Sequence, residues 1–103
     1  MKLWIDDVRP APEGYVWKKS VNDAMDFIQQ LEWYDRYITD VTLEIIDIDH
    51  DAGDYVSDGG DYIKLLDWLE ETGRIYPIHI HSMNPVGVAN MRAIIKRNGW
   101  KEV

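Results

Sequence analysis

Short apolar segments alternate with longer stretches of helical spacing along this chain, and this alternation constrains the fold more than any other feature. Helical patterns of apolar residues begin near residues 21, 60 and 85. Short runs suited to buried strands lie at residues 2–6, 15–18, 43–48, 78–82 and 100–103. Strands and helices that alternate in this way pair the strands in parallel through right-handed crossovers.

The alternation predicts a small three-layer α/β domain. We expect a mainly parallel sheet of about five short strands and about three helices, with helices on both faces. A chain of 103 residues is long enough for one core, so residues 1–103 are expected to form a single domain. Two points stay open, because residues 33–42 fit a helix or a loop and the pairing direction of the first two strands is not determined.

Capping residues predict where the helices begin and end. Ser20, with an acid three residues later, resembles the start of a capping box. Asn84 followed by Pro85 predicts the start of the last helix. Gly73 and Gly99 predict the ends of the second and third helices.

The composition excludes several classes of protein. No apolar run is long enough to cross a membrane, and the first residues lack the apolar core of a secretion signal, so we expect a cytoplasmic protein. The absence of cysteine excludes disulfides and thiolate catalysis. The net charge of −8 argues against a large nucleic-acid footprint. A small phosphate ligand is still compatible with this charge if divalent cations lie between ligand and protein.

Acidic residues gather where the apolar runs end. The first run ends in Asp6 and Asp7, and the third ends in Asp49 and Asp51. No lysine or arginine occurs at residues 37–63. Because buried carboxylates are costly unless they are paired, protonated or bound to a metal, a cation is needed nearby. The carboxyl ends of parallel strands meet at one edge of a sheet, so these four acids predict a Mg²⁺ or Mn²⁺ site.

The same edge carries groups that suit a phosphate ligand. Ser82 offers a hydroxyl, and the helix that begins after Asn84 directs free backbone N–H groups toward the same place. Arg9, in the first loop, is the predicted anion clamp. His50 and His81 are the predicted general acid and base, in either order. A metal, anion donors and two histidines indicate phosphoryl or phosphodiester chemistry.

Other polar residues have structural interpretations. Asp47 alternates with isoleucines and is interpreted as a solvated or capping residue outside the site. His79 lies deeper in its strand and is interpreted as a core or edge histidine. Asp54, Asp58 and Asp61 are interpreted as loop and helix-start acids.

The segment DIDHDAGDYVSD also places acids at positions one, three, five and twelve of an EF-hand loop. The glycine that such a loop needs comes one position late, at Gly53, and a strand-like segment precedes the acids. An EF-hand is therefore disfavoured.

Four segments of the chain together resemble a known family. They read WIDDVRPAPEG, IDHD, GGDYIKLLDWLEE and HIHSMNPVG. Paired acids after the first strand, an acid after the third and a serine after the fourth resemble a response-regulator receiver domain. The four segments are more closely similar to the receiver-like family proposed to process cyclic phosphates. The resemblance covers nearly the whole chain and implies a receiver-like, flavodoxin-like fold.

The resemblance also implies roles for individual residues. In receivers, the acids after the first and third strands hold Mg²⁺, and the third-strand acid accepts a phosphoryl group; the matching positions are Asp6, Asp7 and Asp49. Asp49 is thus implied as a metal ligand, as a nucleophile, or as both. The receiver hydroxyl residue matches Ser82, and the proposed activity on cyclic phosphates adds His50, Asp51 and His81.

The chain also departs from receivers. Loop-like residues 7–14 stand where a receiver has its first helix, and Lys101 is a poor match for the receiver lysine. Phosphorelay signalling is therefore the third hypothesis.

The leading hypothesis is a Mg²⁺- or Mn²⁺-dependent phosphoesterase or phosphotransferase that acts on a small or terminal phosphate. The residues alone indicate only that a metal and a phosphate bind at this site. The resemblance implies that the phosphate is a 2′,3′-cyclic phosphate, in a small molecule or at an RNA end. The alternative is a non-catalytic receiver-like binding or regulatory module with a divalent-cation site. No membrane partner is expected, and the oligomeric state is not determined by the sequence.

Overall fold

The computed structural model describes all residues, 1–103, as four strands, three α-helices and one short 3₁₀ helix. The strands are β1 (Lys2–Ile5), β2 (Tyr15–Lys18), β3 (Ile45–Ile48) and β4 (Ile78–Ile80). The helices are α1 (Val21–Tyr37), α2 (Ile63–Thr72) and α3 (Pro85–Asn98), with the 3₁₀ helix at Gly53–Tyr55. No helix is long and apolar enough to span a membrane.

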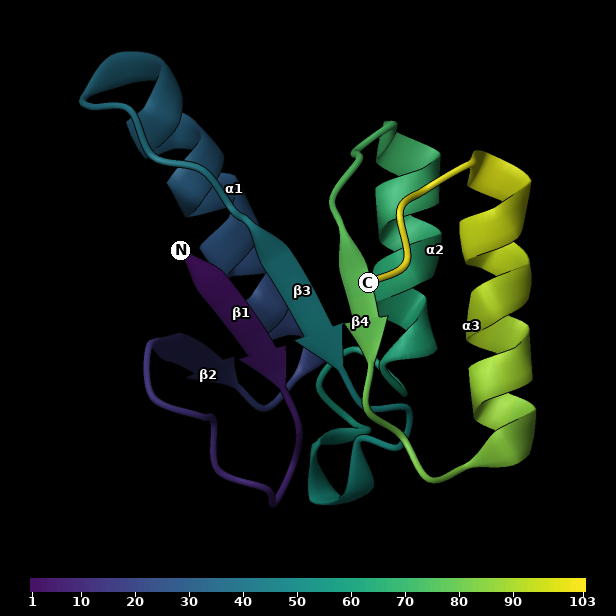
Figure 1. Cartoon of the computed structure of the whole chain (residues 1–103). Coiled ribbons are helices and arrows are strands. Elements are labelled where there is room, and N and C mark those ends of the chain that lie inside the picture. Colours follow the sequence, from purple (N-terminus) through teal and green to yellow (C-terminus); the bar gives the residue numbers. More distant parts are fainter.

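The four strands form one sheet in the order β2-β1-β3-β4, and every neighbouring pair is parallel (Figure 1). Leu3 of β1 lies opposite Val16 of β2 on one side and Ile46 of β3 on the other. The receiver-like α/β class predicted from the sequence is confirmed. The predicted fifth strand is reduced to a single parallel bridge between Ile78 and Glu102, so the sheet has four strands.

Helices α1 and α2 lie on the same face of this sheet, and α3 lies beside α2 past the β4 edge (Figure 1). Helix α1 contacts α2, α2 contacts α3, and all three share one buried cluster with the strands. The domain therefore has two layers, where the sequence predicted three. The strand order explains this. Because crossovers are right-handed, a connection that moves along the sheet toward β4 passes over one face, and a connection that moves toward β2 passes over the other face. Only the β1–β2 connection runs toward β2, and its residues, 6–14, contain no helix.

The strand side chains suit a sheet that is covered on one face. Buried apolar residues point toward the helices: Leu3, Ile5, Ile46, Ile48 and Ile78. The residues that alternate with them carry polar atoms: Lys2, Trp4, Asp47 and His79. A sheet with this alternation can leave one face to solvent.

The predicted helix caps are confirmed. The Ser20 hydroxyl accepts a hydrogen bond from the Asp23 N–H, and the Asn84 side chain accepts one from the Gly87 N–H. Gly73 and Gly99 end α2 and α3 in the left-handed conformation, with φ of 69° and 67°. Helix α1 continues through the ambiguous segment as far as Tyr37, and residues 38–44 lie outside any helix or strand.

Candidate functional site

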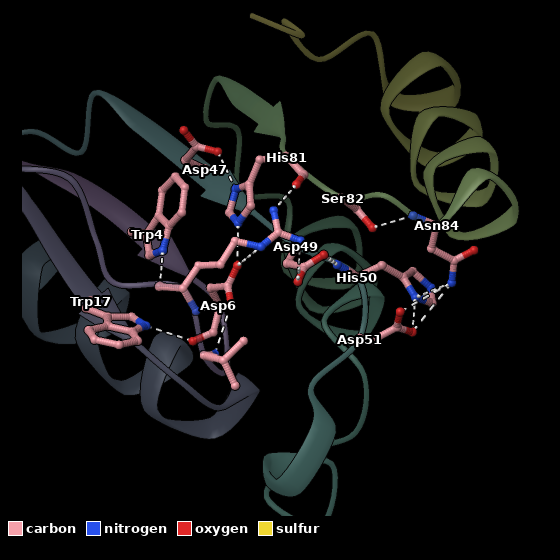
Figure 2. A network of polar contacts seen from close by, with 12 residues as sticks. Trp4, Asp6, Trp17, Asp47, Asp49, His50, Asp51, His81, Ser82 and Asn84 are labelled. Atoms are coloured by element: carbon pink, nitrogen blue, oxygen red, sulfur yellow. Dashed lines mark hydrogen bonds and ion pairs between the residues drawn. The ribbon is translucent and has the colours of Figure 1, made fainter.

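Three strand ends bring acids and a histidine together at the carboxyl edge of the sheet. Asp6 follows β1, Asp49 follows β3, and His81 follows β4 (Figure 2). One side-chain ligand atom from each lies within 4.8 Å of the others. The sequence prediction that these three segments converge is therefore realised in the fold.

Asp6 is fully buried and accepts hydrogen bonds through both carboxylate oxygens. Its Oδ1 accepts from the backbone N–H groups of Val8 (3.0 Å) and Arg9 (2.8 Å), and its Oδ2 lies 3.0 Å from Nε2 of His81. Burial alone would raise the pKa of Asp6, but these hydrogen bonds outweigh it and hold the pKa below its ordinary value. Asp6 is therefore a stable carboxylate.

His81 is held between two carboxylates. Its Nδ1 lies 2.6 Å from Oδ1 of Asp47, and its Nε2 contacts Asp6. Trp4 stacks on the imidazole, with ring centroids 3.8 Å apart and planes only 3° from parallel. Burial alone would lower the pKa of His81, but the hydrogen bonds and charges of Asp47 and Asp6 outweigh it and raise the pKa. Both ring nitrogens thus lie at hydrogen-bond distance from a carboxylate, an arrangement that favours the imidazolium.

Asp47 belongs to this arrangement, although we interpreted it as a residue outside the site. Its carboxylate is the closest partner of His81 and is itself nearly buried. One sequence signal could have found it, since Asp47 is a charged residue inside an otherwise apolar strand. Such a charge needs a partner.

Two tryptophans position the loop that carries Asp6. The indole N–H of Trp17 donates to the backbone carbonyl of Asp6 (2.7 Å), and that of Trp4 donates to the carbonyl of Arg9 (2.9 Å) (Figure 2). Sequence reasoning assigned no function to either tryptophan, because an indole carries no local signal of the carbonyl it will reach. The hydrogen bonds fix both ends of the turn at residues 6–9, which no helix supports.

Arg9 places its guanidinium over the acids. Its Nη1 donates to the carbonyl of His81 at 3.0 Å. Its Nε lies 3.7 Å from Asp6 Oδ2, and its Nη2 lies 3.9 Å from Asp49 Oδ2. The guanidinium thus partly offsets the negative charge of the site.

Asp7 and Asp49 complete the acidic group near β1 and β3. Oδ1 of Asp49 accepts from the backbone N–H of His50 at 2.8 Å, while its Oδ2 faces Arg9. Burial, together with the charges of Asp6 and Asp49, raises the pKa of Asp7. The Asp7 carboxylate lies against Gly53, where any side chain would overlap it.

His50 and Asp51 form a second pair beside the start of α3. The His50 Nδ1 lies 2.9 Å from Asp51 Oδ1, and the Asn84 side-chain amide lies 3.5 Å from both residues. The His50 ring packs on Gly87 in the first turn of α3, where a Cβ would come within 2.6 Å of its Cδ2. Asp51 therefore orients His50 and lies outside the Asp6–Asp49–His81 group that we expected it to join.

Ser82 follows His81 in the chain and lies two residues before Asn84, the N-cap of α3. Its Oγ accepts from the backbone N–H of Asn84 at 3.1 Å, which leaves its hydroxyl hydrogen for a ligand. Asn84 uses its own Oδ1 to cap α3. Ser82 also lines an open groove of about 720 Å³ that follows α3 as far as Lys96.

The remaining acids of the loop have structural partners. Asp61 accepts from the backbone N–H of Ala52, and Asp58 accepts from the Asn22 side chain. Hydrogen bonds from Ser20 and Asn22 lower the pKa of Asp58. The segment before this loop is β3, so the helix that an EF-hand requires is replaced by a strand.

The comparison with protein families agrees with this arrangement. Residues 1–97 match the family model described as a cyclic-phosphate processing receiver domain. No curated protein and no solved structure matches the chain. The match links the chain to the processing of cyclic phosphates, and the matched range includes every strand end and loop described above.

Proposed function

We propose, from the premise that this chain belongs to the family of cyclic-phosphate processing receiver domains, that it hydrolyses a cyclic phosphodiester with a divalent metal ion. The substrate class is a 2′,3′-cyclic phosphate, in a small molecule or at an RNA end. The observation that carries the proposal is the convergence of Asp6, Asp49 and His81 within 4.8 Å.

The donor set fits Mg²⁺ or Mn²⁺ through its carboxylates. These ions prefer oxygen ligands and keep some positions for water or substrate phosphate. Asp6 and Asp49 would hold the ion, with Asp7 beside them. Both nitrogens of His81 already face carboxylates, so we assign His81 to proton transfer and not to the metal. When bound, such an ion offsets charge on the phosphoryl oxygens.

The remaining residues would bind the phosphate and move protons. Ser82, the N–H groups at the start of α3, and Arg9 supply donors for phosphate oxygens. His50, oriented by Asp51 through Nδ1, would accept a proton from the attacking water at its other nitrogen. His81 would return a proton to the leaving oxygen as the phosphorus–oxygen bond of the ring breaks. One water is consumed, and the product is a phosphate monoester.

One observation favours the non-catalytic alternative, a receiver-like module that binds or regulates a partner. The Asp6 carboxylate already has internal partners on both oxygens. A buried acid whose hydrogen bonds are all made by groups of its own chain can have a purely structural function.

Phosphorus NMR of a 2′,3′-cyclic nucleotide and of a short RNA with a cyclic-phosphate end separates the two functions. With Mg²⁺ or Mn²⁺ present, we expect ring opening by the wild type and a loss of at least about 100-fold in Asp49→Asn. Asp40→Asn, an exposed acid on another loop, is the control and should retain the activity. Ring opening that Asp49→Asn leaves unchanged, or its absence in the wild type with both metals, would contradict the proposal.

A further inference from the structure

We propose that Arg9 competes with the divalent cation for the acidic pocket, and that a phosphate anion releases the pocket by drawing the Arg9 guanidinium away. This inference rests on the proposed function, since it concerns the same metal and phosphate sites. Arg9 would thus keep the metal out while its guanidinium lies over the acids, and would let the metal bind once the guanidinium has moved to the phosphate.

The contacts of Arg9 place a positive charge where the cation would bind. The guanidinium lies 3.7 Å from Asp6 Oδ2 and 3.9 Å from Asp49 Oδ2, the two carboxylates proposed to hold the metal. Side chains of Asp6 and Asp49 are 0% and 11% exposed, so little solvent screens these charges. A divalent cation and the guanidinium would repel each other at this distance and cannot share the pocket closely.

The guanidinium is held loosely, while the backbone of Arg9 is held firmly. Both carboxylate distances exceed the length of a normal hydrogen bond, and only the carbonyl of His81 accepts a direct one. The side chain is 46% exposed. In contrast, the Arg9 N–H donates to Asp6 and the Arg9 carbonyl accepts from Trp4. The side chain can therefore leave the pocket without movement of the loop.

An anion gives the guanidinium a better partner. Two oxygens of a phosphate group can accept charge-assisted, bidentate hydrogen bonds from arginine, which are stronger than ion pairs beyond 3.5 Å. The carbonyl that Arg9 contacts belongs to His81, the residue before Ser82. Arg9 thus lies next to the proposed phosphate donors. Phosphate and metal should therefore bind cooperatively, and this coupling must be reciprocal.

The test compares Mg²⁺ binding, measured by isothermal titration calorimetry, in the wild type, Arg9→Gln and Arg36→Gln. Arg36→Gln removes the same charge from an exposed position on α1, so it controls for the change in net charge. Arg9→Gln should bind Mg²⁺ about tenfold more tightly than the wild type, because the ion no longer competes with a guanidinium that pairs with both carboxylates. Arg36→Gln should match the wild type within about twofold. Inorganic phosphate should tighten Mg²⁺ binding more in the wild type than in Arg9→Gln.

The outcomes separate this inference from the proposed function. Equal Mg²⁺ affinity in the wild type and Arg9→Gln would overturn the competition and leave the metal site intact. Weaker binding by Arg9→Gln, with its thermal unfolding unchanged, would also overturn it, because Arg9 would then assist the metal. If neither protein bound Mg²⁺, both the inference and the metal in the proposed function would fail. Tighter binding by Arg9→Gln alone supports the inference whether or not ring opening is detected.

Discussion

The row Asp47–His81–Asp6 places the imidazole between two carboxylates, with Trp4 stacked on the ring. Each nitrogen of His81 contacts its own carboxylate, so a neutral ring can donate to only one of the two. The two carboxylates therefore favour the protonated ring. This preference makes the free energy of unfolding depend on pH in a predictable direction.

His81 should stabilise the fold mainly at low pH. Its pKa in the folded state lies above its ordinary value, so its contribution is fully present below about pH 6.5. That contribution is lost as the pH rises through the raised folded pKa. In metal-free buffer, the difference in free energy of unfolding between the wild type and His81→Gln should be largest below about pH 6.5 and shrink at higher pH. Urea unfolding at several pH values measures this difference.

Trp33→Phe serves as the control for this experiment. Trp33 is an exposed residue of α1 and does not titrate, so its replacement should not reproduce the pH dependence. A wild-type to His81→Gln difference that stays constant between about pH 5 and 9 would contradict the assignment of an imidazolium.

Gly87 and His50 should show coupled effects on stability. In the wild type, Gly87→Ala would place a Cβ 2.8 Å from the His50 Nδ1, and displacement of this partly buried ring should cost about 1–3 kcal/mol. In a His50→Ala background, the same change should stabilise α3 by roughly 0.5–1 kcal/mol, because alanine favours a helix more than glycine does. A double-mutant cycle measured by chemical unfolding reports this reversal of sign. Equal effects in the two backgrounds would show that the ring does not rest on Gly87.

At the scale of elements, a loop joins β1 to β2, where a receiver has its first helix. Indole N–H groups of Trp4 and Trp17 hold its carbonyls, and the Asp6 carboxylate collects two of its N–H groups. The sequence predicted the loop itself from its prolines and glycine. It could not predict the hydrogen bonds, because an indole gives no local signal of which distant carbonyl it will reach.

Removal of one indole N–H should loosen this loop. Trp17→Phe keeps an aromatic ring but leaves the Asp6 carbonyl without its donor, which should lower the free energy of unfolding by about 1–3 kcal/mol. Trp33→Phe is the matched control, since Trp33 is an exposed residue of α1, and its effect should stay within about 0.5 kcal/mol. Chemical unfolding of both variants checks the prediction. Equal effects of the two substitutions would mean that the indole N–H is not needed.

Helix boundaries were easier to predict than strands. The residues Ser20, Asn84 and Gly99 act locally, so their capping functions could be read from neighbouring residues alone. The start of α2 was predicted near residues 58–60, but the helix begins at Ile63 after a 3₁₀ turn and carries no side-chain cap. The fifth strand failed because a strand depends on a partner along its length, and residues 100–103 meet β4 only at its first residue.

At the scale of the whole molecule, the sheet has one face under helices and one without. The alternation of Ile46, Asp47 and Ile48 already contained this information, because a strand buried on both faces would be apolar throughout. The same reading would have placed Asp47 and His81 on a shared face. The three-layer expectation came from the alternation of strands and helices alone. Asp47 was interpreted without knowledge of His81, its partner just after the neighbouring strand.

Two adjacent isoleucines test this one-sided architecture. Ile46→Ala, on the helix-covered face, should lower the free energy of unfolding by about 2–5 kcal/mol. Ile45→Ala makes the same chemical change on the other face, where the side chain is only partly buried, and should cost less than half as much. Thermal or urea unfolding measures both. Equal losses would indicate that a further layer covers the second face.

The anchored backbone and exposed side chain of Arg9 also determine how fast the pocket can respond. Rotamer changes of exposed side chains take picoseconds to nanoseconds, whereas loop movements take nanoseconds to microseconds. Since Trp4 and Asp6 fix the Arg9 backbone, a change of cation requires only the faster motion. The rate of metal entry should then be set by diffusion and by dehydration of the ion, and not by any opening of the fold.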